Sequence, residues 1–344
     1  MNLPEPVNPW NSQPELEAGR RRPATILVND VTLREGEQSE GVSFSQETKV
    51  ELALALEQAG VRQMQIGYPG RFPRDGEATQ AVSAALATAQ IEVIALSFVP
   101  DWEQEVDACL ESGADVITVV YRSSDRLQKL LGVKRAEALK RAEQAVARAA
   151  TGNATVAFIP SDSTRADPSH LAQLWQGAAA AGARRVYVAD SMGAATPELI
   201  ARLVEQAGSL TGLPVGVHCH NDFGLVVANT LAGVNAGAQI VDVAVNGLGD
   251  RAGNAPLEEV VAALALLYGI DAGVDLQWLT TLSRLFAQAS DRPLHPNKPI
   301  SGPSVFVHTL PTHIQAIELD SRSIQPFEPE LVGNQQRIEP RIDA

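Results

Sequence analysis

Eight short runs rich in apolar and β-branched residues recur along the chain, and Ala/Leu/Glu-rich stretches of helical length separate them. Helix signals fall between the runs: Ser45 can cap a helix over residues 46–59 that Gly60 ends, and Thr196-Pro197 opens another. No GxGxxG motif follows the first run, which disfavours a dinucleotide-binding fold. The alternation predicts an α/β protein, a closed (β/α)8 TIM barrel. The predicted strands are residues 25–28, 63–66, 92–96, 115–120, 155–159, 185–189, 214–218 and 239–245.

The length of 344 residues fits one such barrel with an appendage. We expect an N-terminal arm over residues 1–24, the barrel over 25–290, and a linker with a short C-terminal subdomain over 291–344. The linker is Pro/Gly-rich, and the roughly 40 residues that follow it are too few for a core of their own. The last segment is therefore expected to pack against other parts of the protein.

Charge and composition exclude several classes of partner. Lys and Arg number 27 and Asp and Glu 41, a formal net charge of −14, which argues against nucleic acid or an anionic membrane as a partner. The longest nearly apolar run, residues 260–270, is too short to span a membrane. Two cysteines provide no disulfide framework, and no secretory signal is recognisable, so we expect a cytoplasmic protein.

The segment HCHND raises the possibility of a metal site. In an extended segment His218 and His220 project from the same face, so their imidazoles converge; the alternative is a pair of polar residues at a solvated strand end. In a barrel the functional residues follow the carboxyl ends of the strands, and the first such loop supplies Asp30 and Glu35 as candidate carboxylates beside Arg34. Two histidines and one carboxylate leave coordination positions open for substrate, which is typical of catalytic divalent sites and also of non-haem iron oxygenases.

Three ordered segments, NDVTLREGEQ, HCHNDFGLVVAN and NGLGDRAGN, resemble the hallmark motifs of the DRE-TIM metallolyases, more closely the branch of 2-isopropylmalate, citramalate and homocitrate synthases. The resemblance covers residues 25–333. It implies a barrel that holds Mg, Mn or Zn, with Arg34 as the catalytic arginine. The implied metal group is Glu35, His218 and His220; Asn254 either joins it or caps its own loop.

The resemblance also implies an activity, the condensation of acetyl-CoA with a 2-oxo acid. The oxo acid would chelate the metal, and Arg34 would stabilise the alkoxide that develops. Arg165 of PSDSTR matches the family arginine that binds the oxo acid, and Ser191 stands where a substrate-contacting threonine is more common. Tyr68 and Tyr121 are further candidates for contact with the substrate.

The C-terminal tail resembles a small subdomain that related synthases lay over the active site of the neighbouring subunit. This implies a homodimer with exchanged C-terminal arms. His308 and His313 keep the family spacing, and His313 matches the histidine that takes part in catalysis.

At two positions the chain lacks a proton-transfer residue that the resemblance leads us to expect. Ser161 stands in place of a family glutamate, and Ile324 in place of a tyrosine of the tail. Asp162, Tyr121 and His313 are the candidates to replace them. We expect a Claisen-type acyltransferase; the alternatives are a metal-dependent aldolase or lyase on the same barrel, and a catalytically weak binding or regulatory paralogue. The identity of the 2-oxo acid stays open.

Overall fold

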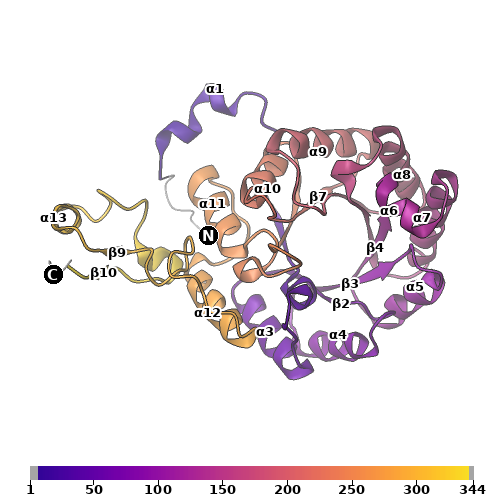
Figure 1. Cartoon of the computed structure of the whole chain (residues 1–344), viewed down its shortest axis with the longest axis horizontal. Helices are drawn as coiled ribbons and strands as arrows, with labels where there is room; N and C mark the ends of the chain where they lie inside the picture. The colour runs from indigo at the N-terminus through magenta and orange to yellow at the C-terminus, as the bar shows by residue number, and fades with distance from the viewer. Residues whose placement is uncertain (1–6, 341–344) are drawn as a thin grey trace.

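The computed structural model describes residues 7–340, and eight parallel strands close into a barrel in chain order, with β1 paired to β8 (Figure 1). The predicted (β/α)8 barrel is confirmed. The strands are β1 (Leu27–Asp30), β2 (Gln63–Gly67), β3 (Gln90–Leu96), β4 (Val116–Arg122), β5 (Thr155–Ser161), β6 (Arg185–Asp190), β7 (Val215–Cys219) and β8 (Ile240–Val243).

Helices surround the barrel and bury its outer face (Figure 1). The predicted caps are present: Ser45 Oγ accepts a hydrogen bond from Thr48 N at 3.1 Å, and Gly60 adopts a φ of 98° where a Cβ would collide with the Gly273 carbonyl. The helices are α3 (Gln46–Gln58), α4 (Pro73–Ala85), α5 (Trp102–Glu111), α6 (Asp125–Leu131), α7 (Arg135–Ala149), α8 (Pro168–Ala180), α9 (Pro197–Thr211), α10 (Val226–Asn235), α11 (Leu257–Tyr268) and α12 (Leu279–Ala289).

The first strand lies two residues later than predicted, because its end is polar yet buried. Asn29 Nδ2 donates hydrogen bonds to Glu92 Oε2 at 2.7 Å and to Asp242 Oδ1 at 2.9 Å inside the barrel. A sequence pattern assigns polar residues to the loop, whereas this barrel interior accepts them because they bond to one another.

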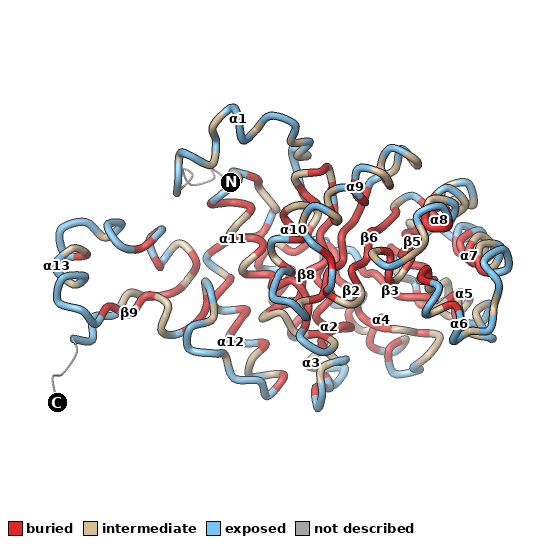
Figure 2. Tube along the Cα trace, turned by 45° about the horizontal axis from the view of Figure 1, so that its top comes forward, coloured by how far each residue is buried: buried red, intermediate tan, exposed pale blue. Residues whose placement is uncertain are grey.

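The arm and the tail lie outside the barrel; residues 1–6 and 341–344 of these predicted segments fall outside the described residues. The arm contains a 3₁₀ turn (Pro9–Ser12) and α1 (Pro14–Glu17), and Arg22 fastens it to α10 and α11 through Asn235 Oδ1 (2.8 Å) and the Tyr268 ring (4.8 Å). In the tail, β9 (Val307–His308) pairs with β10 (Arg337–Ile338). The helix α13 (Pro311–Leu319) stands away from the barrel and is largely exposed (Figure 2). Among residues 7–340, every helix is too short or too polar to span a lipid bilayer.

Candidate metal centre and active site

A single helical turn after β1 positions the arginine and the glutamate of the first loop. The Asp30 carboxylate accepts hydrogen bonds from Thr32 N (3.0 Å) and Thr32 Oγ1 (2.9 Å), and the chain turns into α2 (Thr32–Glu35). Arg34 and Glu35 are both buried at the barrel mouth. Burial raises the pKa of Asp30 to about 7. Asp30 is engaged within this turn, so of the two candidate carboxylates Glu35 alone faces the histidines.

The two histidines converge as the sequence pattern predicted. His218 lies in β7 and His220 directly follows it, with ring centroids 5.2 Å apart. Ligand atoms of Glu35, His218 and His220 all lie within 4.8 Å of one another, and all three residues are buried. Burial, with the nearby Arg34 charge, lowers the pKa of His218 to about 3, and burial beside His218 lowers that of His220 to about 3. Both imidazoles are therefore neutral near pH 7, the form that binds a cation.

A buried carboxylate orients the first histidine. Asp242 of β8 lies 2.9 Å from His218 Nδ1, so a neutral His218 that donates Nδ1–H to Asp242 keeps the lone pair of Nε2 for a metal. Such a partner fixes both the ring and its tautomer. Asp242 is thus part of the candidate centre, although no local motif marks it.

The Asp242→Asn variant should bind a divalent ion about 10- to 100-fold more weakly than the wild-type protein. The amide keeps the shape of the carboxylate but loses the charge that makes His218 a stronger donor to metal. Titration with Mn²⁺ measures the affinity, and the thermal unfolding temperature checks the fold. An unchanged affinity would show that the Asp242 charge is irrelevant to the site.

Asn254, on a glycine-rich loop, is a candidate fourth donor, and its Nδ2 lies 3.3 Å from His218 Nε2. Its Nδ2 donates to the Cys219 carbonyl at 3.4 Å, while its buried Oδ1 has no hydrogen-bond partner among the described residues. A Cβ at Gly249 would collide with this oxygen, which explains the glycine there at a φ of 154°. A buried amide oxygen without a partner is costly unless it meets a cation or water. One carboxylate, two neutral imidazoles and this oxygen fit Mg, Mn or Zn.

Arg34 is held from several sides at the edge of the metal group. Its Nη1 pairs with Glu35 and lies 3.2 Å from Tyr68 Oη, and its Nε donates to Gln65 Oε1 at 2.9 Å. Gln38 Nε2 donates to Glu35 at 2.9 Å. The guanidinium is therefore fixed beside the metal ligands before any substrate contact.

A hydrogen-bonded network continues from Arg34 through the barrel interior to His218. Gln65 Nε2 donates to Glu92 Oε1 at 2.8 Å, and Asn29 joins Glu92 to Asp242, which binds His218. Gln63 and Thr118 also donate to Glu92. Burial raises the pKa of both Glu92 and Asp242. We call this set, Asn29, Gln63, Gln65, Glu92, Thr118 and Asp242, the interior network.

A cavity of about 180 Å³ opens beside the metal group at the carboxyl ends of the strands. One side is polar and includes Arg34, Tyr68 and Ser191; the opposite wall is apolar. The volume is below the roughly 300–1,000 Å³ of sites for drug-sized ligands, so the cavity suits a small organic acid. The lining residues are Arg34, Glu35, Gln38, Tyr68, Ile94, Leu96, Val120, Ile159, Ser161, Ala189, Ser191, His218 and His220.

Comparison with known proteins supplies the family. The sequence model of the HMGL-like family matches residues 25–286, most of the chain. The chain belongs to the HMGL-like family. Its curated relatives include a probable 2-isopropylmalate synthase of Ignicoccus hospitalis, 39% identical over 318 residues, which are 92% of this chain and 79% of the relative. The homocitrate synthase AksA of Methanopyrus kandleri is 38% identical over 317 residues, 92% of this chain and 79% of the relative. The resemblance to the DRE-TIM synthases is therefore confirmed.

Solved structures agree on the fold of this HMGL-like chain. Hydroxymethylglutaryl-CoA lyase from Pseudomonas aeruginosa superposes with a TM-score of 0.66 at 22% identity, covering 78% of this chain and 93% of the lyase. This likeness concerns the barrel and not the reaction. Residues 303–340 lie beyond the matched family segment and include the protruding α13.

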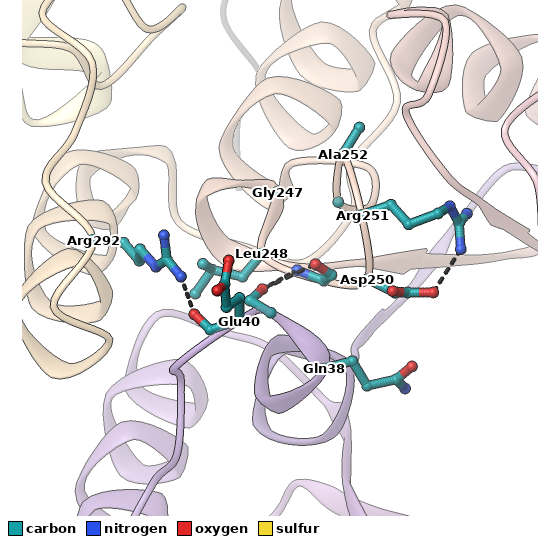
Figure 3. A pocket seen from close by; sticks show the side chains of 11 residues that line it. Gln38, Glu40, Gly247, Leu248, Asp250, Arg251, Ala252 and Arg292 are labelled. Carbon is teal, nitrogen blue, oxygen red and sulfur yellow. Dashed lines mark hydrogen bonds and ion pairs between the residues drawn. The ribbon is translucent and has the colours of Figure 1, made fainter.

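A second and larger pocket of about 510 Å³ lies on the rim of this HMGL-like barrel, beside the mouth (Figure 3). The loop after β1 and the glycine-rich loop after β8 form it, and Gln38 lines both this pocket and the cavity. Ser39 Oγ donates to the Gly249 carbonyl at 2.9 Å and so ties the two loops together. Arg251 and Arg292 stand at its two ends (Figure 3).

The prediction that Tyr121 contacts substrate is wrong. Strand β4 continues to Arg122, and Val120 faces the cavity, so Tyr121 projects outward. Its side chain is fully buried among apolar residues of β3, β4 and α7. Burial raises the pKa of the Tyr121 hydroxyl, which lies far from the cavity lining.

The loop after β5 brings Asp162 and Arg165 to one another and not to the cavity. Arg165 Nε and Nη2 donate to the Asp162 carboxylate, each at 2.8 Å, and Ser124 Oγ donates to it as well. Asp162 N donates to Ser191 Oγ at 2.8 Å, which positions Ser191 at the cavity edge. The expected role of Asp162 in proton transfer is therefore corrected: in this structure its carboxylate anchors Arg165.

The predicted tail histidine lies away from the mouth of its own barrel. His313 is exposed on α13, at the end of the molecule remote from the strands, whereas His308 is buried and bonded to Gln325 at 3.2 Å (Figures 1 and 2). A single chain thus lacks His313 at the cavity. Gln65 and Asp242 are not predicted from the sequence, where their one visible signal is a polar residue at an inward position of a buried strand.

Proposed function

We propose that the protein is a metal-dependent Claisen-type acyltransferase that condenses acetyl-CoA, or a close acyl-CoA, with a 2-oxo acid and releases CoA. The observation that carries the proposal is the buried group of Glu35, His218 and His220 beside Arg34 in one small cavity. The synthase names of relatives 38–39% identical support the same reaction class.

The residues divide the chemistry between them. Glu35, His218 and His220 would hold a divalent ion, which would supply Lewis acidity toward the keto carbonyl of the oxo acid. Arg34, held by Gln65 and Glu35, places a fixed positive charge where the alkoxide develops. Ser191 offers its hydroxyl at the cavity edge for the substrate carboxylate. The apolar wall keeps water from the carbon under attack.

The rim pocket provides room for the acyl-CoA. The cavity is too small for the CoA moiety, which we call the carrier. The larger rim pocket adjoins the cavity through Gln38. An acyl group that enters past Gln38 reaches the metal group while the carrier stays on the rim. Arg292 borders this space and, within the described part of the chain, bonds only to the Glu40 carbonyl, so it offers further donors to the phosphates. Arg251, in contrast, is already paired with Asp222 and Asp250.

Proton transfer requires a group from outside the single chain. The titratable residues that line the cavity, within residues 7–340, are Arg34, Glu35, Tyr68, His218 and His220. Four of these hold or adjoin the metal group, and the Tyr68 hydroxyl accepts hydrogen bonds from Arg34 and Gln38. We therefore assign proton transfer to His313 of a second subunit in a homodimer with exchanged tails. The exposure of α13 and its distance from its own barrel support this arrangement.

Mixed dimers should test the exchange directly. Arg34→Ala and His313→Ala subunits should each be inactive alone, yet co-refolding equal amounts should restore about a quarter of the wild-type rate, since half of the dimers are mixed and each has one intact site. The readout is thiol release per subunit. His295→Ala, which changes an exposed histidine of the linker, is the matched control. A mixture with no recovery would show that His313 does not serve the partner's cavity.

The reaction itself is tested by incubating the protein with acetyl-CoA, Mn²⁺ or Mg²⁺ and a panel of 2-oxo acids while free thiol is followed. Thiol release that needs both the metal and an oxo acid is the expected result. Cleavage of a hydroxyacyl-CoA without an oxo acid would replace the synthase by a lyase. Ligand binding without turnover across the panel would identify a binding paralogue.

A further inference from the structure

Arg122 is a cation at the barrel mouth that the proposed mechanism does not use. It ends β4, two residues beyond Val120, so both side chains project from the same face of the strand. Val120 lines the cavity, and Arg122 is paired in register with Ser161, another lining residue. Arg122 thus follows the lining residues at the end of β4, one step beyond the apolar wall, and is not itself a lining residue.

The guanidinium of Arg122 has no carboxylate partner among residues 7–340. Its central carbon lies 4.3 Å from the centroid of the Phe98 ring, and partial burial lowers its pKa. Stacking on a ring fixes the plane of the group and leaves its N–H edges available as donors. The other arginines of the mouth loops each pair with a carboxylate, namely Arg34, Arg71, Arg165 and Arg251.

Ser161 explains why this arginine is free. It is the register partner of Arg122 across the β4–β5 pair, where a carboxylate would adjoin the guanidinium. Serine cannot neutralise the guanidinium. The wall of the cavity formed by β4 and β5 is thus positive at its upper edge, although the protein as a whole is acidic.

The position of Arg122 relative to the metal group suggests what it binds. In the closed barrel β4 lies opposite β8, while the metal ligands come from β7 and from the loop after β1, the two neighbours of β8. A ligand bound to the metal at one end would cross the apolar wall of Ile94, Leu96 and Ile159 toward Arg122.

We propose that Arg122 binds the distal carboxylate of the substrate, so that the protein selects 2-oxo dicarboxylic acids over monocarboxylic ones. This inference rests on the proposed function and specifies its substrate class. A guanidinium fork matches a carboxylate through two parallel hydrogen bonds. Arg165, the arginine expected to bind the oxo acid, is already satisfied by Asp162.

The test compares Arg122→Met with Arg126→Met, which makes the same change at an exposed arginine on α6. In the presence of Mn²⁺, calorimetry measures binding of 2-oxoglutarate and of a monocarboxylic analogue with an isopropyl group in place of the distal carboxylate. Arg122→Met should weaken 2-oxoglutarate binding about 10- to 100-fold and leave binding of the analogue within about twofold. Arg126→Met should change neither.

Equal weakening of both ligands, or of neither, would overturn the inference. So would a rise in the KM for acetyl-CoA alone, which would assign Arg122 to a phosphate of the carrier. Binding does not depend on turnover, so the two proposals fail separately. A selective loss of 2-oxoglutarate binding in a protein that releases no thiol would reject the synthase and retain the carboxylate site. Full synthase activity with unchanged selectivity in Arg122→Met would retain the synthase and reject the carboxylate site.

Discussion

The double variant His218→Ala/His220→Ala should lose its divalent metal and at least about 10³-fold of its turnover. Both imidazoles are buried, their ligand atoms lie within 4.8 Å of that of Glu35, and burial keeps them neutral, so the proposed site depends on them for its nitrogen donors. Without them Glu35 and Asn254 retain two oxygen ligands, too few to hold an ion firmly. Elemental analysis after dialysis and the thiol assay measure the two effects.

A matched control shows whether the effect comes from the loss of metal ligands or from the removal of any histidine. His295→Ala alters an exposed residue and should keep both metal and activity. The far-ultraviolet circular dichroism of the double variant should match that of the wild-type protein, since the barrel is closed by backbone pairing of all eight strands. Unchanged metal content in the double variant would refute the assignment.

Arg34→Ala should lower kcat about 10²- to 10³-fold while the metal content stays at the wild-type level. The guanidinium is held by Gln65 at 2.9 Å and by Glu35, so its charge is in place before the reaction begins. An interaction that strengthens as charge develops affects kcat more than KM. Steady-state kinetics with saturating metal measure the changes in kcat and KM separately.

Arg34→Lys provides the comparison. Lysine keeps the charge but offers a single ammonium in place of the fork that meets both Gln65 and Glu35, so its kcat should fall between those of the alanine variant and the wild-type protein. A kcat for Arg34→Ala near the wild-type value would remove Arg34 from the mechanism. A parallel loss of metal would show that it supports Glu35 instead.

Features that depend on local periodicity could be predicted from the sequence. The alternation of short apolar runs with helical stretches gave the barrel, and the spacing of His218 and His220 gave their convergence. The errors arise at strand ends. A strand over residues 115–120 leaves Tyr121 in the loop, but β4 continues to Arg122, and the alternation of side chains turns Tyr121 toward α7.

Features that depend on long-range packing could not be predicted. Asp242 lies 24 residues from His218, and Glu92 lies 63 residues from Asn29, so no local motif connects them. The pairing of Arg165 with Asp162 is local, at three residues' separation, but whether an arginine faces its neighbour or the cavity depends on loop geometry. The position of α13 follows from how the tail packs and not from its own pattern.

The interior network has a consequence for any attempt to redesign this protein for stability. In most barrels the interior layers are apolar and can be repacked. Here a leucine in place of Gln65 or Glu92 would leave several buried polar groups without a hydrogen-bond partner, and each such group would lower the free energy of unfolding by about 1–3 kcal/mol. Replacing the whole set at once avoids that penalty but releases Arg34 and His218 from their supports. Substitutions in the interior network that raise the unfolding temperature will therefore lower activity. Stabilising substitutions are better sought on the outer helices.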